Sequence, residues 1–168
     1  MWRFTTETKN TIRLELGCGK KPTPGYIHHD RIRHSAHVDV AHNLDVLPWP
    51  WADNSIDELL ALDVLEHLKV DVNLWLDECH RILAPDGLLT MRVPSWDNPV
   101  SYRDTTHRKV FHEESFHFWD TDHPLWETYG VFYYAEANRW WKIEDVRRVN
   151  PDPRYGVSDL RFVLRKRR

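Results

Sequence analysis

Residues 14–30, LELGCGKKPTPGYIHHD, contain the pattern that decides the fold of this chain. The alternating apolar run that begins at Ile12 ends directly in Gly17-Cys18-Gly19, which is typical of a strand followed by a glycine turn. Because neither glycine carries a Cβ, the backbone can bend there and approach a ligand closely. A glycine pair alone is equally typical of a plain turn. Asp30 adds weight, since a carboxylate at the end of the next strand can accept hydrogen bonds from two ribose hydroxyls.

The same stretch argues against a dinucleotide-binding enzyme. That fingerprint requires a third glycine three residues after the second, where a helix begins. Pro22 occupies this position, within Lys20-Lys21-Pro22-Thr23-Pro24-Gly25. The loop therefore provides neither the close helix packing nor the helix dipole that a pyrophosphate needs, and an NAD enzyme is disfavoured.

Outward from this stretch, strands and helices alternate. Further strands are predicted over 26–30, 37–40, 57–62 and 88–93, and the clearest helix over 71–83, with Asp71 as its cap and Pro85-Asp86-Gly87 as its stop. Residues 94–130 are expected to form loops with one or two short helices. Two strands over 140–149 and 159–164 are expected to form an antiparallel hairpin. The fold class predicted is α/β, a Rossmann-like, mostly parallel sheet with a C-terminal antiparallel hairpin.

Length and composition suggest one domain spanning residues 1–168. A hydrophobic content of 41% excludes a disordered chain. The sequence has no apolar run long enough to span a membrane and no secretory signal, and its two cysteines, Cys18 and Cys79, are expected to be reduced thiols. We therefore expect a soluble, cytoplasmic protein that does not associate with membranes.

The charge distribution makes nucleic acid an unlikely class of partner. The net charge is −3, and the basic residues concentrate in Arg165-Lys166-Arg167-Arg168 at the end of the chain. A nucleic-acid-binding protein would have a broader basic field than this. We interpret the tail as a solvated strand end, with contact to an acidic partner as the alternative.

Three stretches together resemble the class I S-adenosylmethionine (SAM)-dependent methyltransferases. They are LELGCGKKPTPGYIHHD from residue 14, HNLDVLPWPWADNSIDELLALDVLEHL from residue 42, and WLDECHRILAPDGLLTMRVPSW from residue 75. The resemblance covers residues 12–112 and is nearest to the small, methyltransferase-11-like type with a shortened first crossover. It implies a seven-stranded sheet with a terminal antiparallel hairpin, and SAM as the cofactor of an enzyme that transfers a methyl group.

Carried over by motif, the resemblance assigns the cofactor site. Asp30 corresponds to the acid that binds the ribose. The other positions are Glu15, Gly17, Cys18 (through its backbone) and Gly19 for the methionine part, Asn43 and Leu44 for the adenine, and Asp63 and His67 in the segment beside the methyl group. The sequence departs from the family in the short interval between Glu15 and Asp30, which leaves one side of the cofactor less covered.

The acceptor side is suggested by Asp104-Thr105-Thr106-His107, which resembles an Asp-Pro-Thr-His segment of these small methyltransferases with Thr105 in place of proline. His107 is the first candidate for a general base, with Asp104 orienting it or acting in its place. A hydrogen-bonded pair that only fixes the loop is the alternative. His67 either caps local backbone or takes part in the chemistry. Several aromatic residues are candidates for a lid over the acceptor or for core positions: Trp96, Tyr102, Phe111, Phe116, Trp119 and Trp126.

Metal sites are not expected. His112 and His117 lie five residues apart and cannot share a helix face as a zinc-protease pair does, and His37-Val38-Asp39 lacks the all-β context of a two-histidine, one-carboxylate iron site. The segment Leu62-Asp63-Val64-Leu65 also lacks the motif of DNA amino-methyltransferases.

The function predicted is transfer of a methyl group from SAM to an oxygen or nitrogen of a small polar molecule, a sugar or a protein side chain. A non-catalytic binding or scaffold protein that keeps the SAM fold is the alternative. The sequence makes no prediction of oligomeric state.

Overall fold

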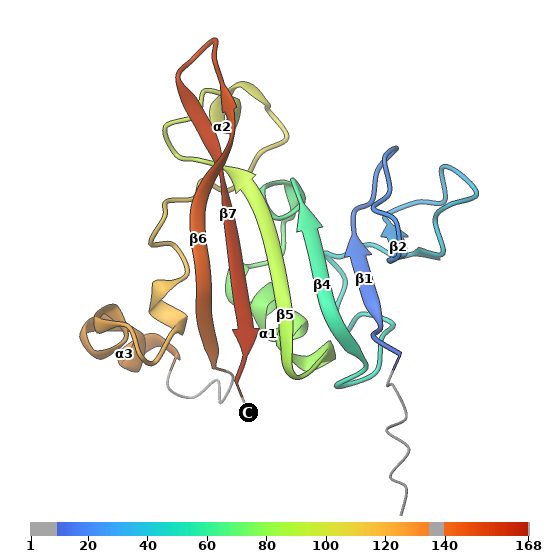
Figure 1. The fold of residues 1–168 in the computed structure, drawn as a ribbon, viewed down its shortest axis with the longest axis horizontal. Helices are drawn as coiled ribbons and strands as arrows, with labels where there is room; N and C mark the ends of the chain where they lie inside the picture. Colours follow the sequence, from blue (N-terminus) through green and yellow to red (C-terminus); the bar gives the residue numbers. More distant parts are fainter. Residues whose placement is uncertain (1–9, 135–139, 168) are drawn as a thin grey trace, which may run out of the picture.

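A computed structural model describes residues 10–134 and 140–167 of the chain. Seven strands form one mixed sheet in the order β3-β2-β1-β4-β5-β7-β6 (Figure 1). The first five are mutually parallel, whereas β7 is antiparallel to both β5 and β6. The predicted fold class is therefore confirmed. The strand bounds are β1 Arg13–Leu16, β2 Ile27–Asp30, β3 Val40–Ala41, β4 Ile56–Leu62, β5 Leu83–Pro94, β6 Trp141–Asp152 and β7 Val157–Lys166.

The strand order reverses beside β1, and this reversal decides where a ligand can bind. The chain runs from β1 outward to β2 and β3, and then returns to β4 on the other side of β1. Because β1 to β5 are parallel, their carboxyl ends lie along one edge of the sheet, the upper edge in Figure 1. In open sheets of this kind a ligand crevice is expected at this edge, beside the strand-order reversal.

The helix α1, Val72–Ile82, is the longest helix of the described residues and packs against one face of the sheet. At its start the Asp71 carboxylate accepts a hydrogen bond from the amide of Asn73, at 2.8 Å. This bond satisfies one of the amides that a helix start leaves without an internal partner. The predicted helix is confirmed, with Asp71 as its cap. Its buried apolar side chains recur at helical spacing: Trp75, Leu76, Cys79 and Ile82.

Strand β5 begins five residues earlier than the predicted start at residue 88. Leu83, directly after α1, pairs with Ile56 of β4, and the pairing resumes between Leu88 and Glu58. The register shifts between these pairs, and Asp86 has a left-handed φ of +64°. The turn-forming residues around Asp86 therefore lie in a bulge of the strand, and do not separate the helix from it as the sequence suggested.

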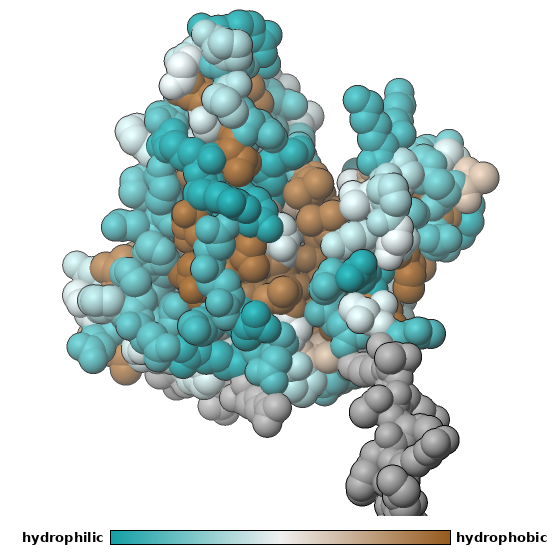
Figure 2. All heavy atoms as spheres, viewed as in Figure 1, coloured by the Kyte–Doolittle hydropathy of each residue, from teal (hydrophilic) through white to brown (hydrophobic). Residues whose placement is uncertain are grey.

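The connections among the first three strands contain no helix. Residues 17–26 and 31–39 form turns and bends, which confirms the shortened first crossover, and the strand expected over 37–40 is reduced to β3. The sheet face toward the viewer in Figure 1 has no helix across β1 to β5, and apolar side chains gather on this face in Figure 2. The site at the sheet edge is consequently built from loops and not from helix ends.

The long segment between β5 and β6 holds more short helices than predicted. Phe116 and Trp119, within this segment, are 0% and 3% exposed and belong to the core. The segment thus covers the sheet as well as connecting strands. Its helices are α2 Val100–Arg103, η2 His117–Trp119, η3 Trp126–Gly130 and α3 Val131–Tyr134; another short helix, η1 Leu65–His67, follows β4.

The basic end of the chain is not the solvated strand end that the sequence suggested. Lys166 is 7% exposed, and its Nζ donates at 2.7 Å to the side chain of Asn54 and to two backbone carbonyls. Arg165 and Arg167 bind the carboxylates of Glu144 and Asp122. These basic side chains therefore bind groups of the protein itself and fix the end of β7 to the neighbouring segments. Arg168 lies outside the described residues.

One hydrophobic core joins α1, the sheet and the segment after β5. The largest fully buried side chains of the described residues include Trp75, Trp141, Phe116 and Phe162. None of the described helices is long and apolar enough to cross a membrane.

Candidate functional site

The glycine turn after β1 is fastened to β2. Gly17 and Gly19 have left-handed φ values of +66° and +57°. The amide of Gly19 donates to Asp30 Oδ2 at 2.9 Å, and the amide of Cys18 donates to the carbonyl of His29 at 2.9 Å. A Cβ on Gly17 would lie 2.6 Å from Cγ2 of Val64, so the turn also approaches the segment after β4 closely. The predicted bend is present, and the close approach observed is to Val64 of the protein itself.

Glu15 supports the turn from below. Its side chain is 5% exposed, and its carboxylate accepts hydrogen bonds from the amide and the hydroxyl of Thr23, at 2.8 and 2.7 Å. This carboxylate therefore anchors the loop between β1 and β2 at Thr23.

Asp30 ends β2 as an ionised carboxylate. Burial alone would raise its pKa, but hydrogen bonds from the amides of Gly19 and Arg31 outweigh burial and hold the pKa below its usual value. His34 adds a further contact at 3.3 Å. The side chain remains 19% exposed, so it can also accept hydrogen bonds from a ligand.

His29, which the sequence analysis did not single out, lies beneath the turn with 1% of its surface exposed. Its Nδ1 accepts a hydrogen bond from the amide of Gly17 at 3.4 Å, and its Nε2 donates a hydrogen bond to the carbonyl of His42 at 2.8 Å. These partners require the neutral ring with its proton on Nε2. Burial lowers the pKa of His29, which favours the same neutral form. Two adjacent histidines at the end of a strand were the available signal.

A first cavity of about 250 Å³ opens between the glycine turn, the end of β2 and the segment after β4. Six of the nine predicted cofactor residues line it: Gly17, Asp30, Asn43, Leu44, Asp63 and His67. Glu15, Cys18 and Gly19 do not line this cavity; Gly19 lines a neighbouring hollow together with Asp30. Convergence of residues from three separate loops is what a ligand site at a strand-order reversal requires.

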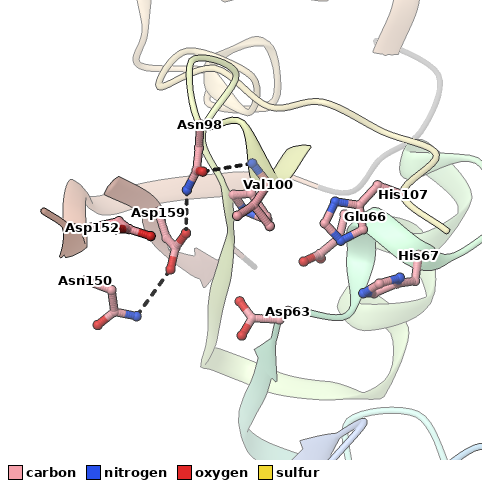
Figure 3. Close-up of a pocket in the computed structure, with 10 residues that line it drawn as sticks. Asp63, Glu66, His67, Asn98, Val100, His107, Asn150, Asp152 and Asp159 are labelled. Carbon is pink, nitrogen blue, oxygen red and sulfur yellow. Dashed lines mark hydrogen bonds between the residues drawn. The ribbon is translucent and has the colours of Figure 1, made fainter. Parts of the chain in front are cut away.

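A second cavity, of about 290 Å³, adjoins the first (Figure 3). Asp63 and His67 line both cavities. Asp63 has a left-handed φ of +57°. Its carboxylate accepts hydrogen bonds from Nε and from one amino group of Arg92. Among the described residues, four carboxylates and no Lys or Arg line this second cavity. Its lining residues are Asp63, Glu66, His67, Pro94, Asn98, Val100, His107, Asn150, Asp152 and Asp159.

His107 and Asp104 are brought together as predicted, with Nε2 3.8 Å from Oδ2. The His107 side chain is 5% exposed and its ring lies against that of His67, with centroids 4.6 Å apart. His67 Nδ1 contacts the hydroxyl of Thr106 at 2.9 Å, and this hydroxyl donates to Asp104 Oδ1 at 2.7 Å. Burial, and then repulsion from His107, lower the pKa of His67. The two rings and Asp104 form one connected cluster at the edge of both cavities.

Glu66 lies beside these rings and was not predicted as a site residue. It is 1% exposed, and neither carboxylate oxygen has a hydrogen-bond partner among the described residues. Burial raises the pKa of Glu66 to about 8. The segment was recognised through Leu65-Glu66-His67-Leu68, but the sequence does not reveal that this side chain points inward.

Of the two roles open to the aromatic candidates, lid or core, three of the six residues take the core role. Phe111, Phe116 and Trp119 are at most 3% exposed and lie in the core. Trp126 packs against the ring of Trp140 and lines neither cavity. Trp96 and Tyr102 alone stand out from the surface, 46% and 64% exposed, so they do not enclose either cavity by themselves.

Two groups of side chains bring at least three potential metal-binding atoms together in the described part of the chain. They are Cys18, His34 and His37 beside the glycine turn, and Glu66, His67 and His107 in the second cavity. Neither includes His112 or His117, whose side chains contact Glu113 and His123 instead.

Comparison with known proteins agrees with this geometry. Residues 14–91 match the family model described as a methyltransferase domain. This match covers just under half of the 168-residue chain. The match confirms the predicted resemblance to methyltransferases and, with it, the prediction of an enzyme. No curated protein matches the chain significantly.

Solved structures show the same fold as this chain at low sequence identity. A SAM-dependent methyltransferase from Archaeoglobus fulgidus is 15% identical with a TM-score of 0.58, over 94% of this chain and 87% of the other. A putative methyltransferase in complex with the Haloferax volcanii activator Trm112 is 13% identical, with a TM-score of 0.60 over 94% and 83%. The 1,6-didemethyltoxoflavin-N1-methyltransferase of Burkholderia thailandensis, with S-adenosylhomocysteine bound, is 18% identical, with a TM-score of 0.53 over 94% and 71%.

The residues of the first cavity fit SAM by their chemistry. Asp30 is an ionised, partly exposed carboxylate of the kind that binds ribose hydroxyls. Leu44 is 4% exposed and provides an apolar wall, and Asn43 beside it provides an amide side chain. The missing side chain at Gly17 lets the backbone border the cavity where a Cβ would strike Val64.

Proposed function

We propose that this methyltransferase transfers the methyl group of SAM to an oxygen or nitrogen of a small polar acceptor bound in the second cavity. One observation carries the proposal: the two cavities share Asp63 and His67, so ligands in both would meet at these residues. When bound, SAM supplies an electrophilic methyl group on a sulfonium. Holding two reactants in line can itself lower a barrier by about 7–11 kcal/mol, so adjacent sites are the main requirement.

In this proposal each cofactor residue acts from its observed place. Asp30 binds the ribose hydroxyls, while Asn43 and the amide of Leu44 contact the adenine. The backbone of Gly17, Cys18 and Gly19 borders the methionine part. Glu15 acts at one remove, because its carboxylate is already bound to Thr23.

We assign the activation of the acceptor to His107, with Asp104 as its positioning residue. Nδ1 of His107 is buried and has no hydrogen-bond partner among the described residues, so its lone pair is available. Asp104 lies 3.8 Å from the other ring nitrogen. An imidazole with a carboxylate behind it can take a proton from a hydroxyl or an ammonium group. General base catalysis of this kind typically raises the rate by about 10²–10⁴-fold, and we expect an effect of this order from His107.

A small acceptor is supported by the size of the second cavity, about 290 Å³, and by its lining residues, which are all polar or charged except Pro94 and Val100. The Burkholderia neighbour, whose name places its methylation at N1 of a small molecule, supports the same class. We further propose that residues 1–168 act as one domain in the cytoplasm; both cysteines are free and buried, as expected in a reducing compartment.

The test combines binding and turnover. Calorimetry measures the affinity for SAM, and labelled SAM with a panel of small hydroxyl and amine compounds measures transfer. Asp30→Ala should weaken SAM binding by at least about tenfold, since a hydrogen bond to a charged group is worth about 1.5–3 kcal/mol. His107→Ala should bind SAM normally and lose turnover. His112→Ala is the matched control, because His112 is 53% exposed and lines neither cavity.

The outcomes separate the candidate functions. Loss of turnover in His107→Ala with retained SAM affinity supports the proposal. SAM binding without transfer to any acceptor would indicate a scaffold that keeps the fold. Absence of SAM binding in the unmodified protein would refute the cofactor assignment itself.

A further inference from the structure

Three potential ligand atoms meet in the second cavity. One atom each from Glu66, His67 and His107 lie within 4.8 Å of one another, and all three residues line the cavity (Figure 3). Two imidazole nitrogens and a carboxylate oxygen form a donor set that suits first-row divalent metals and leaves coordination positions open for a ligand. The proposed function uses His107 alone and leaves this convergence unexplained.

The inner ligand atoms are not satisfied by the protein. Both carboxylate oxygens of Glu66 and Nδ1 of His107 are buried and have no hydrogen-bond partner among the described residues. A buried polar group without a hydrogen bond costs several kcal/mol, roughly, and a bound cation would give the Glu66 oxygens a partner. Glu66 is 1% exposed yet borders an open cavity, so a cation from solvent can reach it.

The outer side of the two rings is held in the manner usual for metal-binding histidines. Thr106 contacts Nδ1 of His67 and donates to Oδ1 of Asp104, while Oδ2 of Asp104 lies near Nε2 of His107. One nitrogen of each ring is therefore directed toward Asp104 or its partner, which leaves the other nitrogen of each ring open. Outer carboxylates of this kind orient the rings and make them stronger ligands.

The charge of the cavity favours a cation at this point. The other three lining carboxylates already have partners: Asp63 binds Arg92, Asp152 binds Arg154, and Asp159 accepts from the amides of Asn98 and Asn150. Glu66 is the one lining carboxylate whose partner is missing among the described residues. No Lys or Arg lines the cavity to fill this place.

The second group of potential ligands, Cys18, His34 and His37, differs in this respect. Both nitrogens of His37 are hydrogen-bonded, Nδ1 to the hydroxyl of Ser35 at 2.6 Å and Nε2 to the carbonyl of Gly19 at 2.8 Å. The thiol of Cys18 points to the carbonyl of Gly19, and His34 contacts Asp30. Hydrogen bonds within the protein hold these three side chains in place, so their proximity requires no bound ion.

We propose that Glu66, His67 and His107 bind one first-row divalent transition-metal ion in the second cavity. The site itself is independent of methyl transfer; its role rests on the proposed function. An ion here would occupy the lone pair of His107 and offer its open positions to an oxygen of the acceptor, so a hydroxyl compound is the expected substrate class. His107 would then act on the acceptor as a ligand of the ion and not as a free base.

The experiment uses the full chain without an affinity tag, stripped of metal by a chelator. Co²⁺ is titrated by visible absorption, and Mn²⁺, Zn²⁺ and Mg²⁺ by calorimetry, with neither SAM nor acceptor present. We expect one transition-metal ion per chain and weaker binding of Mg²⁺, which prefers oxygen ligands. Asp104→Asn should weaken binding by about 10–100-fold, the usual effect of an outer partner, and Glu66→Gln should weaken it more.

His37→Gln is the matched control, since it alters the satisfied group and should leave metal affinity and the Co²⁺ spectrum unchanged. SAM affinity and the denaturation midpoint show that Glu66→Gln has folded. No binding by the unmodified protein, equal binding by Glu66→Gln, or loss of binding in His37→Gln would overturn the proposal. Methyl transfer by the metal-free protein would support the proposed function and show that the ion has no role in it. Metal binding without any methyl transfer would support the metal site and contradict the proposed function.

Discussion

Replacing Gly17 by alanine tests whether the glycine turn and the segment after β4 depend on close contact. At φ +66° an L-residue costs about 1–2 kcal/mol relative to glycine. The new Cβ would also lie 2.6 Å from Cγ2 of Val64, a β-branched side chain that is 8% exposed and cannot easily rotate away. Overpacking of this kind typically costs about 1–3 kcal/mol. The expected total loss of unfolding free energy is therefore about 2–5 kcal/mol.

Gly19→Ala provides the matched comparison. Gly19 has a similar φ of +57°, but nothing lies within 4 Å of its ideal Cβ. The alanine there should cost only the backbone term, about 1–2 kcal/mol. Urea denaturation followed by tryptophan fluorescence measures both variants under the same conditions.

The two variants should differ in SAM binding as well as in stability. Val64 precedes the η1 helix and borders the first cavity with His67, so a displaced Val64 moves part of the cavity wall. Calorimetry with SAM should show a larger loss of affinity for Gly17→Ala than for Gly19→Ala. Equal destabilisation by the two substitutions would show that backbone strain is the whole effect, and the argument from close contact would be wrong.

Three further measurements test the supports of the site and the fold. Burial lowers the pKa of His29 from 6.5, so the unfolded chain binds the proton more readily and stability should fall as the pH decreases below about 6.5; His29→Gln should flatten this slope in denaturation midpoints between pH 7 and 5, roughly the window of that titration. Arg81→Ala removes the guanidinium that binds Glu78, which is 7% exposed, and should cost about 3–5 kcal/mol by denaturation, while Arg81→Lys should recover part of it. Asp71→Ala removes the α1 cap and should cost about 1 kcal/mol; a loss above 3 kcal/mol would indicate a further role.

The strands of the sheet that lie near the glycine turn were predictable because their signals are local. Alternating or continuous apolar residues and turn residues mark β1, β2 and β4 within a few residues of their observed ends. The errors lie where pairing with a neighbour decides the structure. The bulge in β5 keeps Leu83 paired with β4, although the sequence predicted a turn between α1 and a strand that begins at residue 88. The pairing of β7 with both neighbours buries Lys166, although the sequence predicted a solvated strand end.

Part of the site followed from motifs and part did not. Asp30 and Gly17 could be assigned because each directly ends a strand, and strand ends meet at one edge of a parallel sheet. Glu15 matched the family motif, but its carboxylate binds Thr23, because the loop that replaces a helix needs an internal anchor. The aromatic residues of 111–119 were candidates for a lid, yet their area is used to cover the sheet.

By itself the sequence determined the α/β fold class, the resemblance to methyltransferases and the positions of most strands along the chain, since these depend on residues that are neighbours in the sequence. Only the tertiary structure decided that Glu66 is buried beside His67 and His107 with no hydrogen-bond partner in the described part of the chain, and that Asp104 and Thr106 contact those rings on their other side. Burial and the lack of a hydrogen-bond partner depend on every segment that packs around a side chain, so no local pattern can express them.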